Sequence, residues 1–188
     1  LVAGPTANLL SVMNGGWTIT WQGAAEHLYP QDKLTVLEAI REKATGKVTY
    51  VGGDSFDAPI DIQKLVDEAK NHDVILLSLG EQPYTETVGN IETLNLDQGQ
   101  IDLAQAAIAT EKPVVLLTLG GRPRIITSIA EQVSGVILGF LPGMEGGEAL
   151  VVASTIFVAA ITCTIFFVSG EYRHLAASGL ALGAAAVV

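Results

Sequence analysis

The strongest constraint on the fold of this chain is a series of short apolar runs separated by amphipathic segments. Such runs are typical of buried strands, and strands that alternate with helical patterns form a parallel sheet with helices on both faces. We therefore expect an α/β fold, a three-layer α/β/α sandwich on a mostly parallel sheet. The predicted strands are Leu1–Ala3, Val48–Val51, Val74–Leu79, Val114–Leu119 and Val136–Phe140.

Three segments between these strands carry apolar residues at helical spacing. One covers residues 34–41 and follows Asp32, a candidate N-cap. The others cover residues 62–69 and 101–108, and the last ends before Pro113, because a proline disfavours helix in the residue before it. We expect each apolar face to pack against the sheet.

Length and charge limit the classes of protein that this chain can belong to. Its 188 residues suit one domain with a sizeable core and a short appendage. No internal repeat or linker divides residues 1–148, so we predict a single domain there. The net charge of -10 and the scattered Lys and Arg residues argue against a nucleic-acid partner, because phosphate binding needs clustered basic residues.

An apolar tail occupies residues 149–188, and residues 149–170 contain no charged residue. About twenty uncharged residues are the length of a membrane-spanning helix, and we expect the tail to be helical. Its many β-branched residues leave a buried strand, or an aberrant chain end, open as alternatives. The single cysteine, Cys163, excludes an intrachain disulfide and leaves the redox compartment undetermined.

The first residues also predict how the chain relates to its parent protein. Leu1 lies in a predicted strand, with neither an initiator methionine nor a signal segment before it. We expect the chain to be a fragment of a longer protein.

Two glutamates follow the predicted strand at residues 74–79. Glu81 stands at the strand end and Glu86 lies further along the same polar loop. Open α/β sheets keep their chemistry in loops that leave the carboxyl ends of strands. A glycosidase needs one carboxyl group that exchanges a proton with the glycosidic oxygen and another that acts at the anomeric carbon. Because acidic loops are more often only solvated, the two residues alone leave both interpretations open.

Trp17 and Trp21 lie in a segment flanked by glycines. An aromatic face offers an apolar plate to the C–H face of a sugar ring, and nearby Gln, Thr and Asn side chains can bond its hydroxyls. The alternative is that both rings pack in the core. We expect Trp17 to be the more buried ring and Trp21 to be available for stacking on a sugar.

Four motifs in this chain resemble those of one known family. They are Trp-Thr-x-x-Trp-Gln-Gly at residues 17–23, Gly-Glu-x-Pro-Tyr-x-Glu at 80–86, Gly-Arg-Pro at 121–123 and Pro-Gly-x-Glu-Gly-Gly at 142–147. Together they are similar to the second, α/β-sandwich domain of family 3 glycoside hydrolases, in the exo-acting β-glucosidase and exoglucanase branch. The resemblance covers residues 1–148, and the family's Gly-Asp-x-x-Pro-Ser-Gly-Arg-Leu-Pro segment is not found after it.

This resemblance implies a secreted or extracellular hydrolase that removes terminal β-linked glucose from a β-glucoside or β-glucan oligosaccharide with retained configuration and without a cofactor. Glu86 would be its general acid/base. Trp21 would stack on the sugar, and Trp17 is the weaker candidate for the same role. The residues with supporting roles would be Glu81, Tyr84 and Arg122.

The resemblance also implies that the catalytic nucleophile is an aspartate on the family's barrel domain, which precedes this domain. No barrel is found in residues 1–188, so we expect the chain alone to be inactive. The chain departs from the family at Asn90, where the family has an aspartate after the glycine. This change removes a negative charge close to Glu86.

Phosphate and metal sites are not expected. The glycines at residues 143–147 lack the Walker lysine and the G-x-G-x-x-G spacing. The histidines His27, His72 and His174 are far apart and have no neighbours at metal-ligand spacing. His27 lies near the tryptophan segment and is a minor candidate for a sugar contact.

Two other classes of function remain open. A non-catalytic carbohydrate-binding or regulatory module would need Trp21 but not Glu86. A membrane-associated α/β domain of other function would depend on residues 149–170 alone.

Overall fold

The computed structural model describes residues 1–52, 56 and 58–151. The described residues form a five-stranded sheet in the order β2-β1-β3-β4-β5, and every pair of neighbouring strands is parallel. This confirms the predicted fold class. The strands are β1 (Val2–Ala3), β2 (Tyr50–Val51), β3 (Ile75–Gly80), β4 (Val114–Leu119) and β5 (Gly135–Phe140).

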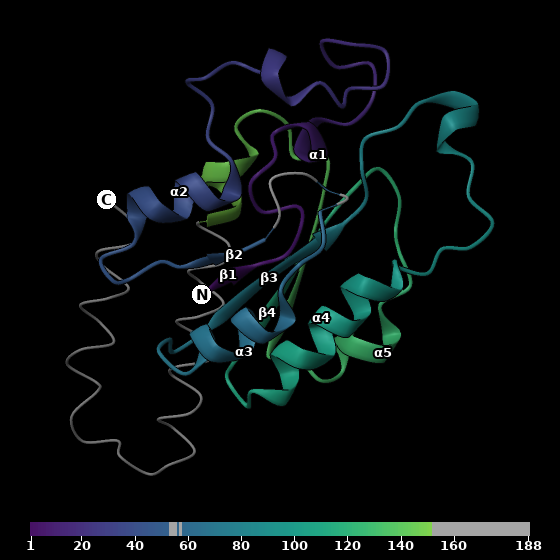
Figure 1. Cartoon of the computed structure of the whole chain (residues 1–188). Helices are drawn as coiled ribbons and strands as arrows, with labels where there is room; N and C mark the ends of the chain where they lie inside the picture. Colours follow the sequence, from purple (N-terminus) through teal and green to yellow (C-terminus); the bar gives the residue numbers. More distant parts are fainter. Residues whose placement is uncertain (53–55, 57, 152–188) are drawn as a thin grey trace.

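Helices cover both faces of the sheet. Helices α3, α4 and α5 lie on one face, whereas α1 and α2 lie on the other (Figure 1). The α-helices are α1 (Ser11–Asn14), α2 (Val36–Lys43), α3 (Ile62–Ala69), α4 (Gln98–Ala109) and α5 (Thr127–Ala130), and the 3-10 helices are η1 (Glu26–Leu28) and η2 (Glu86–Gly89).

Residues 146–151 are also helical. The rest of the predicted tail, residues 152–188, lies outside the described residues. In the part of the chain that the structure describes, no helix is long and apolar enough to cross a membrane.

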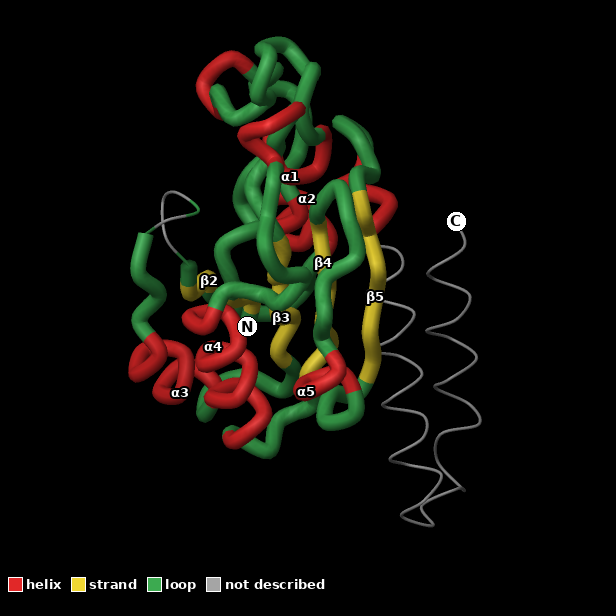
Figure 2. Tube along the Cα trace, turned by 90° about the vertical axis from the view of Figure 1, so that its right-hand side faces the viewer, coloured by secondary structure: helices red, strands yellow, loops and turns green. Residues whose placement is uncertain are grey.

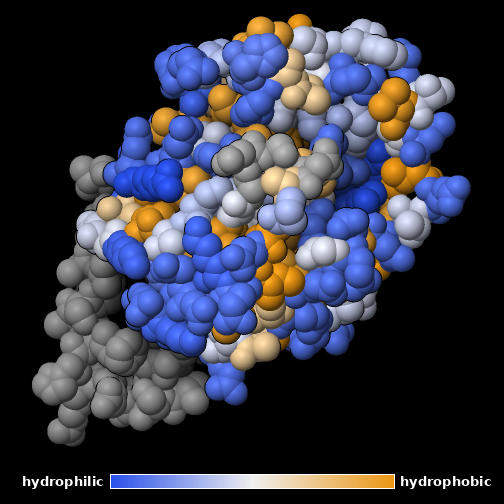
Figure 3. Space-filling view, in the orientation of Figure 1, coloured by the Kyte–Doolittle hydropathy of each residue, from blue (hydrophilic) through white to orange (hydrophobic). Residues whose placement is uncertain are grey.

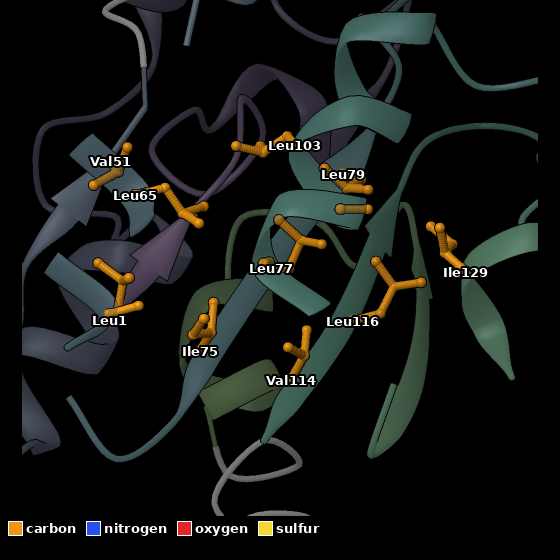
Figure 4. Packing of buried hydrophobic residues seen from close by; sticks show 14 of the residues in the cluster. Leu1, Val51, Leu65, Ile75, Leu77, Leu79, Leu103, Val114, Leu116 and Ile129 are labelled. Atoms are coloured by element: carbon orange, nitrogen blue, oxygen red, sulfur yellow. The ribbon is translucent and has the colours of Figure 1, made fainter. Parts of the chain in front are cut away.

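The two layers of helices explain why β3 is apolar almost throughout. Ile75, Leu77 and Leu79 pack with the helices of one face, and Leu76 packs with those of the other, because successive side chains of a strand point to opposite faces. Figure 4 shows how Leu65 and Leu103 lie over the strands on the first of these faces. A strand that is buried on both faces therefore has an almost continuous run of hydrophobic residues in its sequence.

Helix α2 begins later than the sequence analysis predicts, and its N-cap is Thr35, so the prediction of Asp32 is wrong. Glu38 N donates to Thr35 Oγ1 at 3.2 Å, and Thr35 N donates to Glu38 Oε2 at 2.9 Å. This capping box satisfies two backbone donors that the helix itself cannot use. The outer surfaces of α2 and α3 are largely hydrophilic (Figure 3), as expected for amphipathic helices.

The strand order places a topological switch point between β1 and β3. The chain passes from β1 to β2 on one side and then returns to β3 on the other side of β1. In open α/β sheets, ligands bind beyond the carboxyl ends of the strands at this point. The tryptophan segment follows β1 and the two glutamates follow β3, so both come to the same edge of the sheet.

A buried amide holds the end of β3. Gly80 N donates to Gln100 Oε1 at 2.8 Å, and Gln100 Nε2 donates to Gly80 O at 2.8 Å. Gln100 lies in the first turn of α4 and is buried. It therefore fixes the backbone of β3 directly before Glu81.

We expect Gln100→Leu to lower the free energy of unfolding by about 2–4 kcal/mol, because each buried group of Gly80 that loses its partner costs ~1–3 kcal/mol. Urea denaturation of the chain measures this change. Gln105→Leu, on the exposed side of α4, is the matched control and should change the unfolding free energy by less than about 0.5 kcal/mol. Equal effects of the two substitutions would contradict the role of Gln100.

Candidate active site

A pocket of about 360 Å³ lies at the carboxyl edge of the sheet. The segments that follow the strands gather at this end of the molecule (Figure 2). Residues that line the pocket come from the segments after β1 (Val12, Gly15, Gly16 and Trp17), β3 (Glu81 to Glu86), β4 (Gly120 and Gly121) and β5 (Leu141). The pocket therefore combines side chains from four separate parts of the sequence.

We call residues 81–90 the acid loop. Glu86 begins η2 within this loop, lines the pocket and is exposed. Its backbone has φ 51°, a left-handed conformation that is uncommon for a residue other than glycine. Among the described residues Glu86 makes no ion pair.

Glu81 also lines the pocket, but it is buried and paired with two arginines. Arg122 Nε lies 3.2 Å from Glu81 Oε2, and Arg124 Nη1 lies 3.4 Å from the same oxygen. Arg122 N also donates to Glu81 Oε1 at 3.2 Å. Two guanidinium groups thus neutralise Glu81 and fix its side chain, whereas Glu86 remains exposed to the pocket.

Arg122 joins the acid loop to the segment after β4. Its Nη2 donates to Gly89 O at 2.7 Å, and its guanidinium carbon lies 3.7 Å from the centre of the Tyr84 ring, a cation–π geometry. Burial, and then the negative charge of Glu81, raise the pKa of the Tyr84 phenol above its usual value. Tyr84 therefore remains neutral throughout the physiological pH range.

We call residues 15–23 the tryptophan loop. The exposed fractions are 69% for Trp17 and 50% for Trp21, so the prediction that Trp17 is a buried ring is wrong. The ring centroids lie 6.5 Å apart with an interplanar angle of 57°. Trp17 lines the pocket, whereas Trp21 lies beside Trp17 and does not contribute to the pocket lining.

Three contacts of the site were not foreseen from the sequence. Arg124 shares the charge of Glu81, Gln100 holds the strand end, and Gln22 bonds to Thr85. All three join residues far apart in the chain. For one of these contacts the sequence holds a local indication, because Gln22 is part of the Trp-Gln-Gly motif.

The described histidines do not belong to this pocket. His27 is exposed on η1, and His72 lies before β3 at the opposite edge of the sheet; His174 is outside the described residues. Within residues 1–52, 56 and 58–151, no group of three or more His, Cys, Asp or Glu residues could hold a metal ion.

Comparison with known proteins identifies the family. Residues 1–157 match the model of the glycosyl hydrolase family 3 C-terminal domain. The chain belongs to glycoside hydrolase family 3. Its resemblance to this family, inferred from four motifs, is therefore confirmed.

Several relatives of this family 3 domain are named as β-glucosidases or β-glucanases. The chain is 34% identical to a lysosomal β-glucosidase of Dictyostelium discoideum over 80% of this chain and 19% of the relative. Its structure resembles an exo-1,3/1,4-β-glucanase of a Pseudoalteromonas species with TM-score 0.64 and 26% identity, over 79% of this chain and 18% of that one.

A β-glucosidase of Listeria innocua in complex with glucose is similar, with TM-score 0.65 and 25% identity, over 78% of this chain and 19% of that one. The family 3 domain thus spans about a fifth of the length of these relatives.

We expect Arg122→Met to destabilise the family 3 domain by about 2–3 kcal/mol. When a buried charge loses its only partner, the loss of stability is ~3–5 kcal/mol. We expect a smaller loss here because Arg124 still pairs with Glu81. The control is Arg41→Met on the exposed surface of α2, which should stay within about 0.5 kcal/mol of the unsubstituted chain. Chemical denaturation measures both, and equal stabilities of the two variants would contradict the anchoring role of Arg122.

Proposed function

We propose that this domain is part of a retaining β-glucosidase or exo-β-glucanase that hydrolyses terminal β-linked glucose. The observation that carries the proposal is that Glu86, an exposed carboxyl group, lines the same pocket as the exposed ring of Trp17. The names of the β-glucosidase and exo-β-glucanase relatives support the same class of reaction.

Glu86 is the general acid/base in this proposal. It protonates the departing glycosidic oxygen in the first step and takes a proton from the attacking water in the second. A nucleophilic aspartate of the parent protein's barrel domain attacks the anomeric carbon, and in a retaining enzyme the two carboxyl groups stand about 5–5.5 Å apart. The barrel therefore has to close over the edge of the sheet that carries Glu86.

The different surroundings of the two pocket glutamates support this assignment. Glu81 is buried between Arg122 and Arg124, so its charge is already neutralised and its geometry fixed. Glu86 is exposed in the pocket and can reach a substrate. Of the two glutamates, Glu86 is thus the one suited to exchange protons.

A carbohydrate-binding module without catalysis is the second candidate. The exposure of both tryptophan rings favours it, because exposed aromatic rings are available for stacking on a sugar. Such a module would require the tryptophans and would be indifferent to Glu86.

In the parent enzyme with its barrel domain, we expect Glu86→Gln to slow hydrolysis of glucosides with poor leaving groups by about 10²–10⁴-fold. Activated aryl glucosides should be affected less in the first step, because their leaving groups need little protonation. Azide should restore the second step, since it attacks without general-base help. Steady-state kinetics on both kinds of substrate measure these effects.

The matched control is Glu92→Gln, an exposed glutamate shortly after the acid loop, which should leave both rates unchanged. Equal rates for the two variants would remove Glu86 from the mechanism and favour the carbohydrate-binding module. The 188-residue chain alone should not hydrolyse an aryl β-glucoside. Turnover by the chain that Glu86→Gln abolishes would contradict the assignment of the nucleophile to the barrel.

Trp17→Ala and Trp21→Ala should each lower the free energy of unfolding by less than about 1 kcal/mol, because both rings are exposed. Each should weaken binding of a β-linked disaccharide to the parent enzyme by about threefold to tenfold, the value of one aromatic contact. Calorimetric titration measures binding. The control is Leu28→Ala, which removes an exposed side chain outside the pocket and should leave disaccharide binding unchanged. If Leu28→Ala weakened binding as much as the tryptophan substitutions do, a sugar-stacking role of the tryptophans would be contradicted.

A further inference from the structure

The side-chain amide of Gln22 is bonded to Thr85, the residue directly before Glu86. Gln22 Nε2 donates to Thr85 Oγ1 at 2.7 Å, and Thr85 N donates to Gln22 Oε1 at 3.0 Å. Gln22 in turn directly follows Trp21. A single amide therefore joins the tryptophan loop to the acid loop.

Close backbone packing brings the same two loops together at a second point. A Cβ atom at Gly16 would lie 2.2 Å from Thr85 Cγ2 and 2.4 Å from Tyr84 O. Only glycine permits this approach. Because Gly16 precedes Trp17 and Thr85 precedes Glu86, the contact lies directly beside both pocket residues.

The backbone of Glu86 needs such support. Its left-handed φ of 51° persists in a residue other than glycine only where the surrounding structure holds it. Thr85 is the extended N-cap residue of η2, but its side chain makes no capping hydrogen bond. Its hydroxyl accepts from Gln22 instead, so the conformation of the acid loop at this point is set by the tryptophan loop.

We propose that Gln22 is a positioning residue that holds Glu86 and the tryptophan pair in a fixed relation. This inference rests on the acid/base role proposed for Glu86. Both the amide nitrogen and the amide oxygen of Gln22 are engaged by Thr85. Gln22 thus acts by orienting the two loops around the sugar, so that stacking of the ring and proton transfer occur in one bound geometry.

The first experiment uses the chain itself and needs no activity. Trp17 and Trp21 are the two tryptophans of the chain, so fluorescence excited at wavelengths that only tryptophan absorbs reports on the tryptophan loop alone. Gln22→Met keeps the length of the side chain and removes both hydrogen bonds. It should speed hydrogen exchange of the Thr85 amide by about tenfold, the factor expected for one hydrogen bond, and lower the fluorescence anisotropy.

Gln63→Met is the matched control, because Gln63 bonds only to Asp67 on its own helix in the described structure. It should change neither the exchange rate nor the anisotropy. Equal Thr85 exchange in the two variants would overturn the coupling, whatever the activity of the parent enzyme. A second pair of variants tests the hydroxyl: Thr85→Ser keeps the hydroxyl but loses the methyl group that packs against Gly16, and it should raise the mobility of the tryptophan loop less than Thr85→Val, which removes the hydroxyl. Equal mobility in the two variants would contradict the role of the hydrogen bond.

The second experiment uses the parent enzyme. Gln22→Met should lower kcat on a glucoside with a poor leaving group by about tenfold to a hundredfold, the cost of a displaced catalytic group. If Gln22 acts through Glu86, this loss should disappear in the Glu86→Gln background. Full additivity of the two substitutions would overturn the positioning role.

The two proposals fail in different ways. Unchanged activity of Glu86→Gln would refute the acid/base role, and Gln22 would then have no catalytic group to position. In that case the exchange of the Thr85 amide would still show whether the two loops are coupled.

Discussion

A carboxylate that is removed from water must be paired with positive charge, and the pocket of this domain depends on how Glu81 meets that requirement. Glu81 stands directly after β3 and is shared between Arg122 and Arg124. Arg122 also bonds to the carbonyl of Gly89 and covers the ring of Tyr84. One buried charge thereby ties the end of a core strand to both ends of the acid loop and to the segment after β4.

The topology of the sheet explains why the functional groups meet. The switch point between β1 and β3 opens the carboxyl edge of the sheet, and the segments after both strands enter that space. The tryptophan loop and the acid loop then contact each other through Gly16 and Gln22. An exposed acid and an exposed aromatic ring can therefore face one ligand, although each lies on an irregular segment.

Much of the fold could be predicted because the strands and helices depend on the spacing of apolar residues that are close together in the sequence. Apolar runs predicted the strands, and helical stripes predicted α3 and α4. The prediction of Asp32 as the N-cap of α2 is wrong, although the sequence carries a Thr-x-x-Glu capping-box pattern that begins at Thr35. The prediction of a buried Trp17 is wrong, because a large apolar area alone does not determine burial. Trp17 lies in a turn, its backbone is in the left-handed region, and its side chain is exposed.

The sequence by itself determined the alternating α/β pattern and the family motifs, from which Glu86 is proposed as the acid, because each pattern depends on residues close together in the chain. Only the tertiary structure decided the partners of these residues. Gln22 and Thr85 are separated by 63 positions, and Glu81 and Arg122 by 41. A hydrogen bond or ion pair between such distant residues leaves no periodicity in the sequence, because it forms only after the parallel strands have brought their carboxyl ends to one edge of the sheet.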